Sequence, residues 1–281
     1  MTKNRIICAI LLLILIMSLS SCRTSTDQLE QKFAKYPSDK NVVAVLDNSI
    51  FYFTDHILNL RNIVKDEVPN HGYLFLDGKL YFSVSKQNAA LDFSFLVYEC
   101  DVYGNNLELV FEKHGYKTKP WATGKQSVLY LEYYETNALD NSSRVIDSYN
   151  ISTGVYENVS NGDGSSLEDY RKDTDEKYTF QFENSVISIT DTQNNENYKI
   201  SDKTLHESDF GDILIDLDYS FYGYNETNSG KIYLVYRIKS NGSQYPHFIC
   251  EYIPNTDEVV FKSLFFSNDV ETISVESIND N

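Results

Sequence analysis

The segments KIYLVYRI, residues 231–238, and SVLYLEYY, residues 127–134, show the pattern that decides the fold. In these short runs, aromatic and β-branched side chains alternate with polar ones, which is typical of β-strands. The chain holds 22 Tyr and 16 Phe, against 12 Gly and 5 Pro. After residue 41 we find no convincing long amphipathic helix. The sequence therefore predicts an all-β fold that is large enough for one sizeable core.

A turn-and-strand phrase recurs along the chain and indicates hairpins. It occurs as LDNSIFYF (46–53), LDGKLYFS (76–83), FENSVISI (182–189) and LDYSFYGY (217–224). Residues such as Asp77 and Gly78 tolerate the positive φ that a tight hairpin turn requires. In a second phrase, an outgoing strand meets a turn and a returning strand begins. This second phrase occurs at 98–111, 147–159 and 250–261.

The two phrases are coupled at a similar spacing. Gly78 precedes Val102 by 24 residues, and Gly230 precedes Ile253 by 23. Two coupled hairpins make a four-stranded unit, and four-stranded units repeated around an axis are the blades of a β-propeller. We therefore expect residues 42–275 to form a degenerate β-propeller of about five to six antiparallel blades. The first phrase recurs at uneven steps, which keeps a β-sandwich or tandem antiparallel β-domains open as the alternative.

The first 22 residues carry a targeting signal. The basic start MTKNR precedes the apolar run IICAILLLILIMSLS, which is shorter than the roughly 20 apolar residues of a membrane span. Leu19-Ser20-Ser21-Cys22 at its end resembles the lipobox of bacterial lipoproteins. That resemblance implies removal of a signal peptide at 1–21 and lipidation of Cys22 with the two or three acyl chains, palmitate among them, that are typical of the family. The protein would then sit on the extracytoplasmic face of the cell membrane, or on the periplasmic face in a double-membrane cell.

A second, shorter resemblance concerns the part after the lipobox. The phrase at 147–159 resembles the outer hairpin of the YncE-like and TolB-like propeller proteins, where a strand ends near an acidic residue and turns through Thr-Gly. Thr153-Gly154 is that turn in this sequence. The repeated Trp of those proteins is absent, because Trp121 is the one tryptophan. The resemblance implies a propeller fold.

The chain is strongly acidic, with a formal charge of -17 at pH 7. Removal of residues 1–21, which hold Lys3 and Arg5 and no acid, changes the formal charge to -19. A chain this acidic repels phosphate backbones and anionic lipid headgroups, so we expect no nucleic-acid partner and no attachment through a basic patch. The expected contact with the membrane is the lipid on Cys22, and an envelope protein is the expected partner.

Two segments flank the predicted β-domain. Residues 22–41 are polar. We interpret them as the lipidated cysteine followed by a tether that connects it to the β-domain. Ser25-Thr26-Asp27-Gln28 has the spacing of a capping box, which predicts a short helix through about Lys35, with a disordered segment as the alternative. Residues 276–281 are expected to form a flexible tail.

Cys100 and Cys250 are the two cysteines left beyond the predicted lipidation site. In FLVYECDV and HFICEY each cysteine shares one face of a strand with apolar neighbours, so both thiols are expected to point into the core. Two buried free thiols are the favoured interpretation. An oxidising compartment permits a disulfide between them, which is the less favoured alternative.

The sequence singles out no catalytic residue and predicts no cofactor. No HxH or HxxxH pair is present, and neither is a GxSxG elbow or a Gly-rich phosphate loop. The acidic loop at 161–176 holds Asp163, Asp169 and Asp173, which are candidate ligands of a hard cation, although their spacing is not that of an EF-hand. A second acidic segment, DFGDILIDLDYS, would place Asp212, Asp216 and Asp218 on one face if it were a strand.

These observations favour a non-enzymatic binding or scaffold module at the cell envelope. The alternative is an extracytoplasmic hydrolase that acts on glycans with paired carboxylates. Tyrosine pairs such as Tyr133-Tyr134 and Tyr222-Tyr224 are candidates for stacking on sugars, although covering of the sheets is the simpler explanation of these residues. A solute-binding receptor component ranks third, because the strand–helix alternation of two-lobed α/β receptors is missing.

Overall fold

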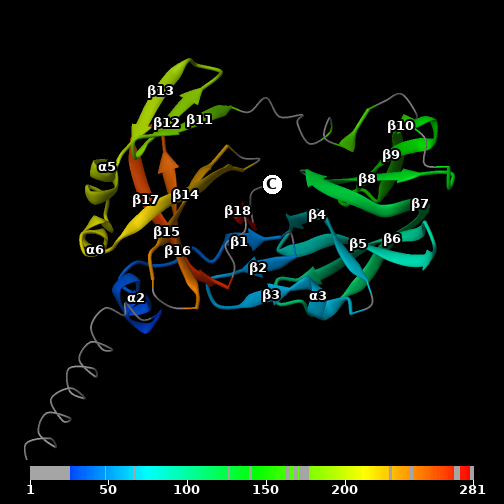
Figure 1. Ribbon diagram of the computed structural model, residues 1–281, viewed down its shortest axis with the longest axis horizontal. Helices are drawn as coiled ribbons and strands as arrows, with labels where there is room; N and C mark the ends of the chain where they lie inside the picture. Colours follow the sequence, from blue (N-terminus) through cyan, green and yellow to red (C-terminus); the bar gives the residue numbers. More distant parts are fainter. Residues whose placement is uncertain are drawn as a thin grey trace, which may run out of the picture.

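The computed structural model of the 281-residue chain is mostly β (Figure 1). It describes residues 26–47, 49–65, 67–125, 127–138, 141–161, 165–167, 170, 177–227, 230–240, 243–268 and 273–278. The predicted signal peptide at 1–21, the lipidation site Cys22 and the candidate metal ligands Asp163, Asp169 and Asp173 lie outside these residues. Within the described ranges, no helix has the length and apolar character needed to cross a bilayer.

The first sheet, sheet A, joins the two ends of the folded body. It contains β1 (Val42–Leu46), β2 (Ile50–Tyr52), β3 (Ile57–Asn59) and β18 (Ile273–Ser277) in the order β18-β1-β2-β3. The last strand pairs antiparallel with the first, so that Leu46 lies opposite Ile273. Ile278 is buried as well. The segment expected to be a tail from residue 276 therefore begins inside the sheet.

Sheet B is an antiparallel meander of seven strands, in which each strand pairs with the next along the chain. The strands are β4 (Val68–Leu76), β5 (Lys79–Ala89), β6 (Asp92–Asp101), β7 (Glu108–Lys125), β8 (Val128–Tyr134), β9 (Arg144–Asn150) and β10 (Val155–Asn161). A 3₁₀ turn, η1 (Asn141–Ser143), precedes β9. The long strand β7 pairs with β6 from Glu108 to Tyr116, and with β8 at Tyr116 and again from Trp121 to Lys125. One strand thereby fuses what the sequence predicts as two separate four-stranded units.

Sheets C and D form the other end of the molecule. Sheet C contains β11 (Tyr178–Glu183), β12 (Val186–Asp191) and β13 (Glu196–Ile200), and sheet D contains β14 (Tyr219–Glu226), β15 (Ile232–Ile238), β16 (Tyr245–Ile253) and β17 (Glu258–Ser267). The described helices are short: α2 (Thr26–Phe33), α3 (Leu60–Ile63), α5 (Asp202–His206) and α6 (Gly211–Leu214). The fold is thus mostly β, with antiparallel sheets of four, seven, three and four strands.

The predicted hairpin turns are present where the residues allow a positive φ. Asp77 and Gly78, with φ of 50° and 73°, are the two residues between β4 and β5. Asn184 and Ser185, with φ of 52° and 64°, do the same between β11 and β12. The phrase at 217–224 is different: it follows α6 rather than a hairpin turn, so it begins a sheet instead of continuing one.

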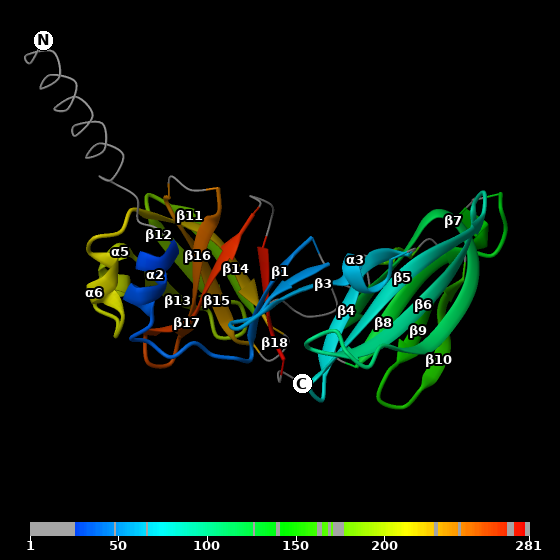
Figure 2. The same ribbon diagram turned by 90° about the horizontal axis from the view of Figure 1, so that it is seen from below.

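The sheets pack face to face in the order C, D, A, B, as Figure 2 shows. Strand β1 lies in the middle of this stack. Its residues Val43 and Val45 pack against sheet B, and Ala44 packs against sheet D. The same division occurs in β15, where Leu234 faces sheet C and Val235 faces sheet A. A strand covered on both faces needs a nearly continuous apolar run. VVAVL is such a run, and IYLVYRI, for which the sequence predicts alternation, is buried along almost its whole length as well.

The helix α2 belongs to this body. It begins at Thr26, inside the segment for which the sequence predicts a tether, and it ends at Phe33 rather than near Lys35. Leu29 and Phe33 are buried in the core between sheets C and D. Residues 26–33 therefore pack as part of the fold instead of spacing it from the membrane.

Candidate functional site

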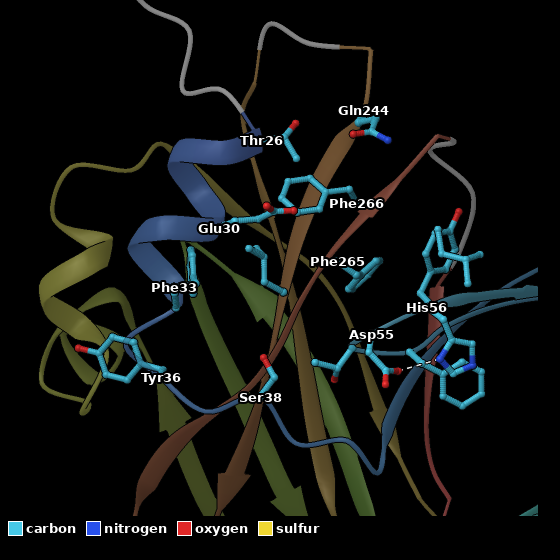
Figure 3. Close-up of a pocket in the computed structure, with 16 residues that line it drawn as sticks. Thr26, Glu30, Phe33, Tyr36, Ser38, Asp55, His56, Gln244, Phe265 and Phe266 are labelled. Atoms are coloured by element: carbon cyan, nitrogen blue, oxygen red, sulfur yellow. Dashed lines mark hydrogen bonds and ion pairs between the residues drawn. The ribbon is translucent and has the colours of Figure 1, made fainter. Parts of the chain in front are cut away.

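A cleft of about 630 Å³ lies where α2, the β2–β3 turn and the end of β17 meet (Figure 3). It combines aromatic rings with a small number of polar groups. Its lining consists of Thr26, Glu30, Phe33, Ala34, Tyr36, Ser38, Tyr52, Phe53, Thr54, Asp55, His56, Ile57, Gln244, Leu264, Phe265 and Phe266. A volume in the range of about 300–1,000 Å³ and a lining of this kind are typical of small-molecule sites.

The aromatic wall of the cleft is held in place by rings behind it. Phe33 packs on Phe261 with the ring centroids 5.2 Å apart. Phe265 lies between Tyr52, at 5.6 Å, and His247, at 5.1 Å with nearly parallel planes. Since these supporting rings are buried, Phe33 and Phe265 cannot move without disturbing the core.

His56 holds one edge of the cleft together. Its ring is stacked between Phe53, at 4.3 Å, and Tyr103, at 4.2 Å. Nδ1 lies 2.7 Å from Oδ1 of Asp55, and Nε2 lies 2.7 Å from the carbonyl oxygen of Val102. The Asp55 carboxylate and the Val102 carbonyl thus fix the orientation of the His56 ring from two sides. The hydrogen bond from His56 lowers the pKa of the Asp55 carboxyl.

The turn between β6 and β7, which contacts His56, packs closely against sheet A. Asp101 Oδ1 accepts the backbone N–H groups of Tyr103, at 2.9 Å, and Asn105, at 2.8 Å, which closes a tight turn after β6. Gly104 has a φ of +78°, and a Cβ atom there would lie 2.7 Å from a methyl carbon of Ile63. The glycine therefore lets the β6–β7 turn sit directly under sheet A, where Val102 and Tyr103 meet His56.

The remaining polar groups of the cleft differ in whether they already have hydrogen-bond partners within the fold. Tyr36 donates a hydrogen bond to Asp212 at 2.5 Å, and this bond raises the pKa of Tyr36 to about 12. Thr54 donates to the carbonyl of Asp39 at 3.3 Å. Among the described residues, by contrast, the exposed Glu30 carboxylate has no hydrogen-bond or ion-pair partner. Figure 3 shows Glu30 and Gln244 toward one end of the cleft and Asp55 with His56 toward the other, with Phe265 between them.

The residues that the sequence singles out lie elsewhere. Cys100 in β6 and Cys250 in β16 are both buried and free, in different parts of the core. Burial raises the pKa of both thiols, that of Cys100 to about 12. Tyr133 is buried and donates to Asp147 at 2.6 Å, whereas Tyr224 is exposed and stacks on Phe180. These two tyrosines therefore have structural contacts of their own.

The second acidic segment does not form the predicted shared face. Residues 211–214 are helical, so Asp212, Asp216 and Asp218 are not neighbours on one strand. Asp212 accepts from Tyr36, Asp216 pairs with Lys32 at 3.8 Å, and Asp218 pairs with Lys239 at 2.8 Å. No group of three or more His, Cys, Asp or Glu suited to a metal ion occurs within the described ranges.

A second polar cluster, within sheet B, is engaged in structural contacts. The buried carboxylate of Asp147 accepts from Tyr133, from Tyr156 and, at 2.9 Å, from Asn158. The Lys113 ammonium lies 4.0 Å from it and over both tyrosine rings. A buried charge with this many partners stabilises the packing of β8, β9 and β10 against β7, and it leaves little capacity for a ligand.

Comparison with known proteins gives only remote structural likeness. No protein-family model matches the chain, and no curated protein sequence matches it. An α-L-arabinofuranosidase from Clostridium thermocellum aligns at 12% identity over 72% of this chain and 56% of its own, with a TM-score of 0.26. A GDP-mannose-dependent mannosyltransferase from Leishmania mexicana aligns at 9% identity over 71% and 70% of the two chains, with a TM-score of 0.24.

An α-L-arabinofuranosidase from Fusarium graminearum aligns at 12% identity over 75% of this chain and 56% of its own, with a TM-score of 0.24. This chain thus spans just over half the length of either arabinofuranosidase. Similarity at this level establishes neither the fold nor the activity of this chain, which has to be argued from its own residues.

Proposed function

We propose that this protein is a lipid-anchored binding module of the cell envelope and that the cleft beside α2 is its binding site. The observation that carries this proposal is that several polar groups of the cleft already have hydrogen-bond partners within the fold. Both ring nitrogens of His56, the Asp55 carboxylate and the Tyr36 hydroxyl are already bound to other parts of the fold. Groups held in this way shape and rigidify a surface, whereas a general acid or base needs a free position for the proton it transfers.

The position of the cleft suits a protein held at a membrane. Thr26 lines the cleft, and Cys22 precedes it by four residues. Four residues span at most about 14 Å when fully extended. With a lipid on Cys22, the cleft would therefore lie close to the extracytoplasmic surface of the bilayer, where a membrane-associated partner or ligand meets it. Two or more acyl chains on Cys22 would give stable attachment.

We further propose that the sheets are the blades of an open five-bladed propeller. Sheets A, C and D would be one blade each, and sheet B would be two, with β7 shared between them. Two observations support this assignment. Each sheet packs face to face on the next, and the last strand completes the sheet that the first strand begins. In a propeller, four-stranded blades are likewise arranged one after another around an axis.

A glycan hydrolase is the second candidate function. Glu30 and Asp55 come from different elements and both line the cleft, as an acid–base pair would. In this case Asp55, whose pKa is lowered by its hydrogen bond with His56, would be the ionised member of the pair. Hydrolysis of a glycan by the intact chain, abolished by either Glu30→Gln or Asp55→Asn, would favour this function over binding alone.

Site-specific photo-crosslinking in native membranes tests the binding proposal. Ile57 lines the cleft and is 60% exposed, so a photoreactive phenylalanine analogue can replace it without loss of packing. The matched control is the same analogue at Val155, which is 46% exposed in β10, in sheet B. We expect one discrete crosslinked species from position 57 and none from 155, with loss of that species when Cys22→Ala releases the protein. Equal or absent crosslinking at the two positions would contradict the proposal.

A further inference from the structure

Strand β11 leaves one edge of sheet C without a neighbour. In the described part of the chain, sheet C has three strands in the order β11-β12-β13, whereas sheets A and D have four (Figure 1). The N–H of Tyr178 points away from β12, since it donates to the Glu226 carboxylate at 3.2 Å. Because backbone groups alternate in direction along an antiparallel strand, those of Phe180 and Phe182 point to the same open edge.

This edge lacks the features that usually prevent one chain from pairing with another. Edge strands of natural proteins are commonly interrupted by a proline or a β-bulge, or are covered by another segment. Other edge strands of this molecule have such features. Pro69 and a register shift interrupt β4, and a further shift follows Asn158 in β10. In β17 the carbonyl of Lys262 accepts the N–H of Asp39. By contrast, β11 pairs with β12 without a shift and contains no Pro or Gly.

Aromatic side chains lie beside the open edge. Phe180 stacks on Tyr224 with the ring centroids 3.7 Å apart, and Phe182 packs on Phe221 at 4.9 Å. Phe182 is nevertheless 54% exposed. A strand that adds to this edge would therefore gain apolar burial as well as backbone hydrogen bonds.

The segment KYTFQFE, which is β11 with the residue before it, is complementary to itself in antiparallel pairing. When two copies are aligned about Phe180, each Phe180 pairs with its counterpart, and Tyr178 pairs with Phe182. Lys177 then lies opposite Glu183. This register joins residues whose backbone groups point outward, and it sets ring against ring and positive charge against negative charge. Such cross-strand pairs stabilise neighbouring strands.

The charges at the two ends of this segment suit the pairing. Glu183 is exposed, and no described residue binds its carboxylate. The Lys177 ammonium lies at the other end, 4.9 Å from the centroid of the Tyr178 ring. The formal charge of -17 makes two copies repel each other at long range. At about 0.15 M salt, however, that repulsion is screened beyond about 8 Å, so the local pairs decide the contact.

We propose that the edge of β11 is an interface between two copies of this chain, whose β11 strands pair antiparallel about Phe180. The pairing would join two three-stranded sheets into one sheet of six strands and would cover Phe182 with Tyr178 of the second copy. This inference goes beyond the proposed function and does not depend on the cleft, because no residue of β11 lines the cleft.

A charge exchange tests the interface. Sedimentation equilibrium of the full chain, in detergent matched to the density of the solvent, should show a dimer. Lys177→Glu and Glu183→Lys each place like charges opposite each other twice in the symmetric pair, so each should weaken the dimer about tenfold. The double variant Lys177→Glu/Glu183→Lys restores opposite charges and should restore association. Glu157→Lys, at an exposed acid of β10, changes the net charge as Glu183→Lys does and should leave the dimer unchanged.

Engineered disulfides test the register. In the proposed pairing, Thr179 of one copy lies opposite Gln181 of the other, and both residues are exposed. The chain with both Thr179→Cys and Gln181→Cys should form a disulfide-linked dimer on oxidation. Neither single variant should do so, because each position lies opposite the other and not opposite itself. The single variants also control for the native cysteines.

Three results would overturn the inference. The first is a full chain that stays monomeric, and the second is a dimer that both single charge variants leave intact. The third is a disulfide that either single-cysteine variant forms alone, which would mean a different register. A disulfide from the double-cysteine chain to a different protein in native membranes would assign the edge to another partner and would overturn the inference as well.

Discussion

At the scale of single residues, Gly211 allows α6 to begin directly against α5. A Cβ atom at this position would lie 2.1 Å from the backbone carbonyl oxygen of His206, which has no means of moving aside. We expect Gly211→Ala to lower the free energy of unfolding by about 1–3 kcal/mol, because the two helices have to separate. Gly223→Ala is the matched control, since its new methyl group meets no atom within 4 Å. Urea unfolding of both variants measures the difference, and equal effects would refute this account.

His247 predicts a pH dependence of stability. Its ring is buried between Phe265 and Tyr222, Nδ1 bonds to the carbonyl of Tyr245, and Nε2 has no partner among the described residues. Burial, with a further contribution from the charge of Arg237 on the neighbouring strand, lowers the pKa of His247 to about 4.

The sign of that dependence follows from which state binds the proton. Between the usual histidine pKa of about 6.5 and a pKa of about 4, the unfolded chain is protonated at this position and the folded chain is not. Stability contributed by the neutral ring is therefore complete above about pH 6.5 and is lost as the pH falls toward 4. The loss is on the order of 3 kcal/mol. His247→Phe should flatten this part of the stability profile, whereas substitution of the exposed His206 should leave the profile unchanged. If His247→Phe keeps the same slope of stability against pH as the unsubstituted protein, the assignment is contradicted.

Individual site residues were poorly predictable from the sequence. Glu30, His56 and Phe265 come from segments far apart in the chain, and only the fold brings them to one cleft. The sequence pointed instead to clustered acids, because proximity along the chain is visible there. In the structure Asp212 and Asp218 each have a separate partner, so a local cluster of charge did not become a site.

At the scale of elements, β18 holds the end of the chain in the middle of the stack. Val275 in this strand is fully buried against sheet D. We expect Val275→Ala to reduce the free energy of unfolding by about 1–3 kcal/mol through lost apolar burial and the cavity left behind. Val159→Ala, at an exposed position of β10, should change it by less than about 0.5 kcal/mol. Similar values for the two variants would mean that β18 adds little to the fold.

Elements were easier to predict than the relations between them. The alternation and the turn residues predicted the hairpins at Asp77-Gly78 and Asn184-Ser185, because period and positive φ are local properties. The shared strand β7 and the docking of α2 depend on partners elsewhere in the chain. Leu29 and Phe33 are two apolar residues in a polar segment, and their burial becomes evident only when the core that receives them is known.

At the scale of the whole molecule, the stack of sheets predicts one cooperative unfolding transition. Sheet A packs on sheet B through one face and on sheet D through the other, so neither end can lose its structure alone without exposing β1. Cys100 reports on the core between sheets A and B, and Cys250 reports on the core between sheets C and D. We expect both thiols to resist alkylation in the native state and to become reactive at the same urea concentration. Mass spectrometry of the two cysteine peptides reads this directly, and separate midpoints would indicate independent halves.

The measurement that tests the central claim most directly is accessibility of the cleft in intact cells. A cysteine replaces Ile57 in one variant and Val155 in another, and a maleimide that does not cross membranes is added outside the membrane that carries the protein. The account predicts labelling of Val155→Cys in cells, protection of Ile57→Cys in cells, and labelling of both after purification, because the cleft is occupied in its native setting. Equal labelling of both positions in cells would show that the cleft is empty. Labelling of neither position before permeabilisation would show that the protein lies on the cytoplasmic side of the membrane. Either result contradicts the account.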